Sequence, residues 1–214
     1  MSLADLLPDV VVLRAGAVDD PRWDALVSDV ERAPVARAVP SRVRDFVAGR
    51  GCAHEALAAL GIPGGPVAVG ERRGPVWPAG VVGSITHGAG EVAAAVAHAT
   101  DVAALGIDVE PLRVLPPEVA ALVRSADERA RLASSGLDDD TAALVLFSAK
   151  ESVFKAWHPL RGTWIEFDHA DVDLAADGSF TARVTSPGGG PGVVWAGRWE
   201  VDGAVVRTAV VVPA

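Results

Sequence analysis

The stretch LGIDVEP, residues 105–111, carries two acidic side chains within an otherwise apolar segment. Residues two apart in a strand point to the same face, so Asp108 and Glu110 share one face while Ile107 and Val109 share the other. Two carboxylates this close repel each other unless a cation lies between them, and such hard oxygen ligands suit Mg²⁺ better than a softer metal. Taken alone, the pair is equally consistent with a strand end that turns a solvated face outward.

A second group of reactive side chains lies in FSAKESVFKAW, residues 147–157. Ser148 and Glu151 have the Ser-x-x-Glu spacing of a capping box, and Glu151 and Lys155 have the spacing of an ordinary helical ion pair. If Thr141 or an acid before it starts the helix instead, Glu151 is released from capping. Glu151 would then supply the third carboxylate that a two-acid metal site lacks.

The segment GPVWPAGVVGSITHGAG, residues 74–90, places His87 near two hydroxyl residues, Ser84 and Thr86. Its glycines could let backbone amides approach a phosphate, but they match no phosphate-loop pattern. A lone histidine is more often structural or simply exposed. The histidine therefore gains a function only through its neighbours.

Basic residues precede this segment: Arg42, Arg44 and Arg50, followed by Arg72 and Arg73. Most arginines on a protein surface are solvated. In a chain with a net charge of −9, however, arginines grouped just before an apolar strand could form a local anion site.

Apolar periodicity and turn residues predict the elements that must position these side chains. We expect strands at residues 9–15, 81–87, 91–99 and 103–110, of which 91–99 is also compatible with a helix. We expect helices at residues 19–38, 41–60, 116–132 and 141–158. A β-rich tail follows, with hairpin turns at Asp177-Gly178 and Asp202-Gly203 and a loop at residues 186–192.

This order of helices, strands, helices and strands predicts an α+β chain with two similar halves. The length of 214 residues suits two small, closely packed halves or one larger domain. We place the boundary between residues 104 and 105, which gives an N-terminal half, 1–104, and a C-terminal half, 105–214.

Composition excludes several classes of protein. The net charge of −9 argues against general nucleic-acid binding and against attraction to an anionic membrane surface. The single cysteine, Cys52, excludes an internal disulfide and a thiolate metal cluster. The first residues, MSLADLLPDV, have no basic region and no long apolar core, so we expect a soluble cytoplasmic protein without a secretory signal.

Taken together, four segments resemble the 4′-phosphopantetheinyl transferases. They follow one another in the order seen in that family: RVRDFVAGRGCAHEAL, GERRGPVWPAGVVGSITHGAG, GIDVEP and FSAKESVFKAWHPL. The resemblance runs from about residue 41 to residue 165 and is strongest to the bacterial group that includes the enterobactin synthetase component D enzyme and its actinobacterial relatives. GIDVE and FSAKESVFKAW are highly specific in combination.

The resemblance implies two pseudo-symmetric α+β halves with coenzyme A bound in the cleft between them. It implies Mg²⁺-dependent transfer of the 4′-phosphopantetheine group from coenzyme A to a serine of an apo acyl or peptidyl carrier protein, with release of adenosine 3′,5′-bisphosphate. The carriers would belong to fatty-acid, polyketide or non-ribosomal peptide synthases, including pathways of secondary metabolites and siderophores. The N-terminal half would hold the nucleotide, and the C-terminal half the metal and the catalytic residues. We expect a monomer.

The same resemblance assigns roles to individual residues. The Mg²⁺ ligands would be Asp108, Glu110 and Glu151. The catalytic residues would be Asp108, Glu151, as the candidate base acting directly or through a water, and Lys155, on the phosphate oxygens. The residues that bind coenzyme A would be Arg44, Arg50, Arg72, Thr86, His87 and Lys155. Relatives commonly have Ser at the position of Thr86 and Lys at the position of Arg72, and Arg73 could take the place of Arg72.

Two other functions use the same residues. A metal-dependent hydrolase would cleave a pyrophosphate with water and modify no protein. A binding module would hold coenzyme A or a carrier protein without chemistry, although the intact set Asp108, Glu110, Glu151 and Lys155 counts against it.

Overall fold

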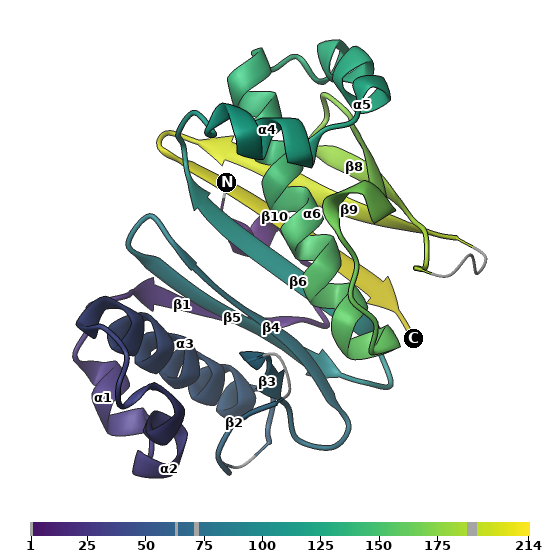
Figure 1. Cartoon of the computed structure of the whole chain (residues 1–214). Coiled ribbons are helices and arrows are strands. Elements are labelled where there is room, and N and C mark those ends of the chain that lie inside the picture. The colour runs from purple at the N-terminus through teal and green to yellow at the C-terminus, as the bar shows by residue number, and fades with distance from the viewer. Residues whose placement is uncertain (1, 63, 71–72, 188–191) are drawn as a thin grey trace.

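The computed structural model describes residues 2–62, 64–70, 73–187 and 192–214. Two antiparallel sheets form its centre, each covered on one face by a long helix (Figure 1). The mixed composition of helices and strands confirms the α+β class expected from the sequence. Among the described residues, no helix has the length and apolar character needed to cross a membrane.

The N-terminal sheet contains three strands in the order β1-β5-β4: β1 (Val12–Ala17), β4 (Val81–Gly88) and β5 (Glu91–His98). Helix α3 (Pro40–Ala59) packs on it through a core that includes Val47, Cys52 and Leu57. The short helices α1 (Arg22–Leu26), α2 (Asp29–Arg32) and η2 (Ala33–Val35) lie beside α3. The remaining elements of this half are η1 (Leu3–Leu6) and the two-residue strands β2 (Ala68–Val69) and β3 (Pro75–Val76).

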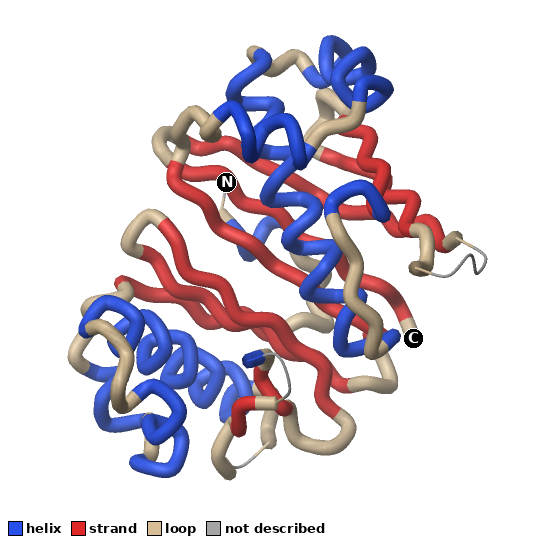
Figure 2. The backbone as a smooth tube through the Cα atoms, in the orientation of Figure 1, coloured by secondary structure: helices blue, strands red, loops and turns tan. Residues whose placement is uncertain are grey.

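The C-terminal sheet contains five strands in the order β6-β10-β9-β8-β7. Their bounds are β6 (Val102–Pro111), β7 (Ala170–Leu174), β8 (Ser179–Val184), β9 (Val193–Asp202) and β10 (Val205–Pro213). Helix α6 (Asp139–Arg161) crosses one face of this sheet (Figure 2). The shorter helices are α4 (Pro117–Val123), α5 (Ala126–Arg131), η4 (Leu132–Ser135) and η5 (Phe167–His169).

Most elements agree with the sequence predictions, including α3, β4, β5, β6, α6 and the glycine turns at Gly178 and Gly203, both of which have positive φ. Strand β1 begins at Val12 rather than at residue 9, because a turn precedes it in which the Val11 N–H donates to the Pro8 carbonyl. The segment predicted at residues 91–99 forms a strand over residues 91–98 and not a helix.

The two helices predicted at residues 19–38 and 116–132 were wrong as continuous elements, since both are broken. The breaks fall at Val27 and Arg124, whose backbones are extended. In each case a Ser-x-x-Glu capping box starts a new helix directly after the break: Glu31 accepts from the Ser28 N–H, and Glu128 accepts from the Ser125 N–H.

The strongest predicted helix, α6, starts in the way that frees Glu151. Asp138 is the N-cap, and its carboxylate accepts from the Thr141 N–H at 3.0 Å. Ser148 therefore lies inside the helix, and its hydroxyl caps nothing. The capping-box interpretation of Ser148 and Glu151 was wrong.

The two halves meet where β4 runs beside β6. The Ser84 hydroxyl accepts from the Ile107 N–H, and the Thr86 hydroxyl accepts from the Val109 N–H, both at 3.1 Å. A Cβ on Gly88 would lie 2.1 Å from the Val109 carbonyl oxygen, so only glycine fits there. The boundary that we placed between residues 104 and 105 falls inside β6, and the division into 1–104 and 105–214 stays a prediction.

A central apolar cluster also joins the two halves. It combines alanines of β5 with Leu105, Ile107 and Val109 of β6 and Ala209 of β10. The residues that alternate with Ile107 and Val109 face α6 instead: a Cβ on Gly106 would lie 1.9 Å from the Ser152 carbonyl oxygen. Alternation along β6 thus places Asp108 beneath α6, as the sequence pattern indicates.

Candidate active site

Asp108 is the buried centre of the site, with 4% of its surface exposed. Lys155 Nζ lies 2.6 Å from its Oδ1 and also donates to the Ile107 carbonyl at 3.1 Å. Thr86 donates to the same Oδ1 at 3.4 Å, and Ser148 donates to Oδ2 at 2.8 Å. A buried carboxylate requires this kind of compensation by a cation and hydroxyl donors.

Glu110 and Glu151 lie within electrostatic range of Asp108. Burial, followed by the charge of Asp108, raises the pKa of Glu110, whereas Arg113, at 3.4 Å from its Oε2, opposes the rise. Burial also raises the pKa of Glu151; the charge of Lys155 opposes that rise, and the charges of Asp108 and Glu110 add to it. The structure therefore brings together the three carboxylates that the sequence analysis singled out.

The donor set of this cluster suits a hard divalent cation, because three carboxylates in a partly desolvated region face only two cations, Lys155 at Asp108 and Arg113 at Glu110, among the described residues. Within the described part of the chain, no three His, Cys, Asp or Glu side chains are arranged as a ready-made metal site. At Asp108, the ammonium group of Lys155 holds the position next to the carboxylate. Asp108, Glu110 and Glu151 are the residues that could hold a cation here.

A cleft of about 210 Å³ opens beside Lys155, between the two halves. One wall comes from β4 and the segment before it, and the other from α6 and the chain beyond it. The lining residues are Arg73, Gly74, Pro75, Gly83, Ser84, Ile85, Phe154, Lys155, His158, Pro159 and Trp164.

A second depression, of about 230 Å³, lies on the other side of Phe154 and Trp164. These two rings touch edge to face, with centroids 4.5 Å apart, and they line both spaces. The second depression is mostly apolar, with walls from Ile165 and Phe167, and Glu151 lines it as well. Phe154 and Trp164 therefore separate two spaces, one of which is lined by Lys155 and the other by Glu151.

Arg50 is an unusual cation in the N-terminal half. Only 4% of its surface is exposed, and its Nε and Nη2 atoms have no hydrogen-bond partner among the described residues. Its guanidinium lies over the Phe46 ring, 4.7 Å from the centroid. Burial lowers the pKa of Arg50 to about 10, with Glu31 opposing this and Arg42 adding to it. Buried donors without acceptors indicate a place for an anion.

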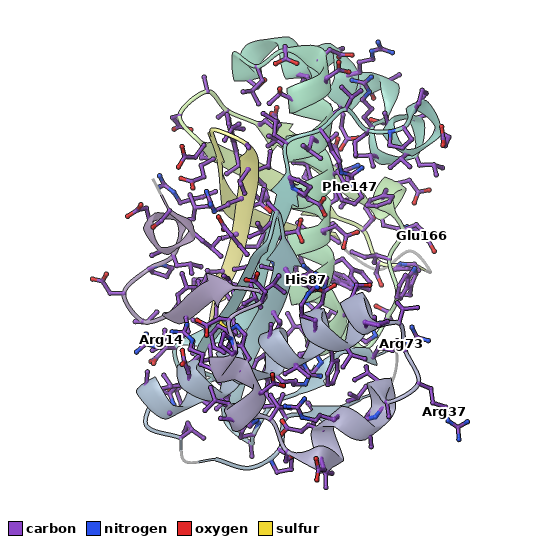
Figure 3. The ribbon with its side chains drawn as sticks, turned by 90° about the vertical axis from the view of Figure 1, so that its left-hand side faces the viewer. Arg14, Arg37, Arg73, His87, Phe147 and Glu166 are labelled. Atoms are coloured by element: carbon purple, nitrogen blue, oxygen red, sulfur yellow. The ribbon has the colours of Figure 1, made fainter. Side chains whose placement is uncertain are left out.

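His87 lies between the basic residues of α3, such as Arg42, and the carboxylate of Asp108. In Figure 3 it lies between the helices of the two halves, whereas Arg37 points away from it. Although His87 reaches the surface, partial burial lowers its pKa; Asp45 opposes this, Lys155 and Arg42 add to it, and Asp108 opposes it. His87 therefore lies within electrostatic range of α3, α6 and β6.

The structure separates the other predicted ligands of coenzyme A. Arg44 lines a different depression, next to Asp20 and Trp23 of the α1 region. The hydroxyl of Thr86 is buried at the β4–β6 contact. Arg72 lies outside the described residues, and Arg73 lines the cleft.

Arg42 is the residue that the sequence analysis did not select, although it belonged to the basic set. Its charge acts on both Arg50 and His87. The spacing held a signal, because positions 42, 46 and 50 share one face of a helix, whereas position 44 is outside that series.

Comparison with known proteins identifies the family of the chain. Residues 30–97 match the 4′-phosphopantetheinyl transferase N-terminal domain, and residues 104–199 match the 4′-phosphopantetheinyl transferase superfamily. The 4′-phosphopantetheinyl transferase Svp of Streptomyces mobaraensis is 46% identical over 222 residues, which cover 99% of this chain and 89% of the relative.

Two relatives with lower sequence identity also indicate this family. The 4′-phosphopantetheinyl transferase PptT of Mycobacterium tuberculosis is 37% identical over 220 residues, covering 94% of this chain and 96% of PptT. Enterobactin synthase component D of Escherichia coli K12 is 41% identical over 117 residues, or 54% of each chain. On these grounds the chain belongs to the 4′-phosphopantetheinyl transferase superfamily of enzymes.

Proposed function

We propose that this enzyme transfers the 4′-phosphopantetheine group of coenzyme A to a serine of an apo acyl or peptidyl carrier protein, with Mg²⁺, and releases adenosine 3′,5′-bisphosphate. The observation that carries the proposal is the position of His87, which is within electrostatic range of Arg42 on one side and of Lys155 and Asp108 on the other. A polyanion such as coenzyme A needs cations from both halves, because it carries phosphates at two places.

The phosphates have natural partners in this arrangement. Arg50 offers buried donors without acceptors among the described residues, and Arg42 lies within electrostatic range of both Arg50 and His87, which suits the 3′-phosphate of the nucleotide. Lys155 and Arg73 line the cleft and suit the pyrophosphate. The apolar depression beside Glu151 suits the uncharged pantetheine arm.

In the reaction, the carrier serine oxygen attacks the phosphorus that bears pantetheine, and the bond from this phosphorus to the adenosine bisphosphate oxygen breaks. Asp108, Glu110 and Glu151 would hold Mg²⁺, which when bound neutralises charge on the pyrophosphate. Lys155 stabilises the charge that develops on the leaving phosphate. Glu151 accepts the serine proton, directly or through a water.

The test is to incubate the enzyme with coenzyme A, Mg²⁺ and a panel of purified apo-carriers, and to measure the mass of each intact carrier. A gain equal to one phosphopantetheine group, abolished by EDTA and by Asp108→Asn, supports the proposal. Unchanged masses across fatty-acid, polyketide and non-ribosomal peptide carriers overturn it. Adenosine 3′,5′-bisphosphate released without any carrier would instead indicate a hydrolase. The pathway served, a monomeric state and a cytoplasmic location stay predictions.

A further inference from the structure

Three buried hydroxyls form a chain that ends on Asp108. Ser152 Oγ lies 2.7 Å from Thr208 Oγ1, Thr208 Oγ1 lies 3.0 Å from Ser148 Oγ, and Ser148 Oγ lies 2.8 Å from Asp108 Oδ2. None of the three hydroxyl residues has any exposed surface. Thr208 belongs to β10, 60 residues beyond Ser148 and outside the segments 74–90, 105–111 and 147–157.

The direction of these hydrogen bonds follows from the ion pair at Asp108. A carboxylate paired with Lys155 only accepts, so Ser148 must donate its single proton to Asp108 Oδ2. Thr208 donates its single proton to the Ser148 carbonyl oxygen, 2.8 Å away, and its Oγ1 also lies 3.0 Å from Ser148 Oγ. Ser152 donates to Thr208, at Oγ1 or at the carbonyl oxygen, 3.2 Å away. The Ser148 proton is therefore committed to Asp108, and Thr208 fixes the turn of α6 that carries Ser148 through its bond to the Ser148 carbonyl oxygen.

The chain lies where α6 approaches the sheet most closely. Gly106, two residues before Asp108, packs directly on the Ser152 backbone, so no side chain separates helix from strand at this point. Apolar side chains would fill such a space without the need for hydrogen bonds, and buried hydroxyls are costly unless they are all satisfied. Their complete satisfaction, ending on a candidate metal ligand, indicates that they orient that ligand.

We propose that Thr208 is a positioning residue for the reaction, acting on Asp108 through Ser148. The inference rests on the proposed function and deepens it. Thr208 holds Ser148, and Ser148 turns Asp108 Oδ2 toward the protein. This leaves Oδ1 to Lys155 and Thr86, at the side of the carboxylate that faces the cationic residue of the cleft. A carboxylate fixed before the cation arrives loses less freedom when it binds, which strengthens binding.

The experiment compares Thr208→Val, which keeps the shape but removes the hydroxyl, with Thr208→Ser, which keeps the hydroxyl. Mg²⁺ binding is measured by titration calorimetry in the presence of coenzyme A without a carrier, so the readout does not depend on turnover. We expect Thr208→Val to weaken Mg²⁺ binding by about 10- to 100-fold, in line with the loss of other groups that orient metal ligands. Thr208→Ser should restore binding to within about threefold of the unmodified enzyme, since it rebuilds the donor.

Ser135→Ala is the matched control, because Ser135 is another buried serine of this half, bonded only locally to the Leu132 carbonyl and to the Leu137 N–H. It should leave Mg²⁺ binding unchanged. If Thr208→Val fails to fold, Ser148→Ala carries the same test, because it removes the donor to Asp108.

Unaltered Mg²⁺ affinity in Thr208→Val, or in Ser148→Ala where it replaces it, overturns the inference, as does an unmodified enzyme that binds no Mg²⁺. Failure of the proposed function is a separate result: Mg²⁺ binds and depends on Thr208, but no carrier gains mass.

Discussion

Lys155 Nζ lies 2.6 Å from Asp108 Oδ1, and this ion pair joins α6 to a strand 47 residues earlier in the chain. In the proposed function Asp108 would hold a divalent cation, and the ammonium group already lies against this oxygen of its carboxylate. Two cations cannot share this oxygen without strong repulsion. Binding of a metal should therefore move Nζ away from Asp108, toward the cleft that Lys155 also lines.

This relationship predicts opposite effects of Lys155→Ala on catalysis and on metal binding. Turnover should fall by about 100- to 1,000-fold, as when other transition-state donors are removed, and coenzyme A affinity should fall much less. Mg²⁺ affinity should rise, because the competing cation is gone. Transfer kinetics and calorimetric titrations measure these quantities, with Arg37→Ala as an exposed control. A larger loss in coenzyme A binding than in turnover would reduce Lys155 to an anchor.

Removal of the buried guanidinium by Arg50→Met should weaken coenzyme A binding by about tenfold or more, the loss expected for charge-assisted hydrogen bonds. The same change should remove the preference for coenzyme A over 3′-dephospho-coenzyme A. Stability of the free protein should stay unchanged or increase, since a buried cation without hydrogen-bond partners is replaced by an apolar chain. Calorimetry measures the affinities, and urea unfolding measures the stability. If the unmodified enzyme bound coenzyme A and 3′-dephospho-coenzyme A equally well, the assignment of Arg50 to the 3′-phosphate would be contradicted.

The geometry also predicts an order among the neighbouring arginines. Arg42→Met should weaken coenzyme A binding more than Arg44→Met, because Arg42 acts on His87 and Arg50, whereas Arg44 lines the depression near α1. The dissociation constants of the two variants for coenzyme A, measured under the same conditions, test this order. If Arg44→Met weakened coenzyme A binding more than Arg42→Met, Arg44 would be the ligand of the nucleotide instead.

A pH dependence of stability follows from Glu151. Burial raises its pKa above the ordinary value of 4.5, with Lys155 opposing and Asp108 and Glu110 adding to the rise. A carboxyl group whose pKa is higher in the folded state stabilises the fold below the unfolded pKa, and this contribution is lost as pH rises through the folded pKa. Without metal, the unfolding free energy should therefore contain a part that falls as pH rises above 4.5, and Glu151→Gln should lack it.

Urea unfolding in EDTA between pH 4.5 and neutrality measures this difference, as the unfolding free energy of the unmodified protein minus that of Glu151→Gln. Near neutrality and without Mg²⁺, the unmodified protein should be the less stable of the two. Added Mg²⁺ should make the unmodified protein the more stable one, because the cation favours the ionised carboxylate. If the unfolding free energies of the unmodified protein and of Glu151→Gln changed with pH in parallel in EDTA, Glu151 would be solvated in the free protein.

Arg207 should be essential for stability rather than for chemistry. Its guanidinium donates to both Glu91 oxygens, at 2.7 and 3.0 Å, and to Glu200 Oε1 at 3.1 Å, so it joins β5 of one half to β9 and β10 of the other. Arg207→Met leaves Glu200 buried without its cation and should lower the unfolding free energy by about 3–5 kcal/mol.

The double substitution Arg207→Met with Glu200→Gln should recover part of that loss, since it removes the uncompensated charge. Arg198→Met, an exposed arginine of β9, is the control and should change stability by less than about 0.5 kcal/mol. A single substitution at Arg207 that costs as little as the control would mean that the three-residue cluster is solvated.

A repeated local pattern shows where prediction from sequence stops. Ser-x-x-Glu occurs at Ser28, Ser125 and Ser148. In the first two cases it starts a helix, because the residue before it is extended. In the third, Asp138 has already started the helix, and the serine hydroxyl turns to Asp108 instead. The pattern is the same, but its role depends on a cap ten residues upstream and on a strand elsewhere in the chain.

Local rules in the sequence alone were sufficient for the α+β class and for the long helices and strands around the site, whereas the roles of Asp108, Glu110, Glu151 and Lys155 came from the family resemblance and stay predictions. Periodicities of two and of 3.6 residues decide which side chains share a face, and these periodicities need no knowledge of the fold. The segments that resemble the family, GIDVEP and FSAKESVFKAWHPL, contain these four residues.

Only the tertiary structure decided which arginine joins His87, that the Thr86 hydroxyl is used at the contact between β4 and β6, and that Thr208 lies in line with Asp108. These relationships depend on the register between strands and on the height at which α6 crosses its sheet. Both are set by packing between segments far apart in the chain, such as Gly106 against Ser152, and no local pattern encodes them.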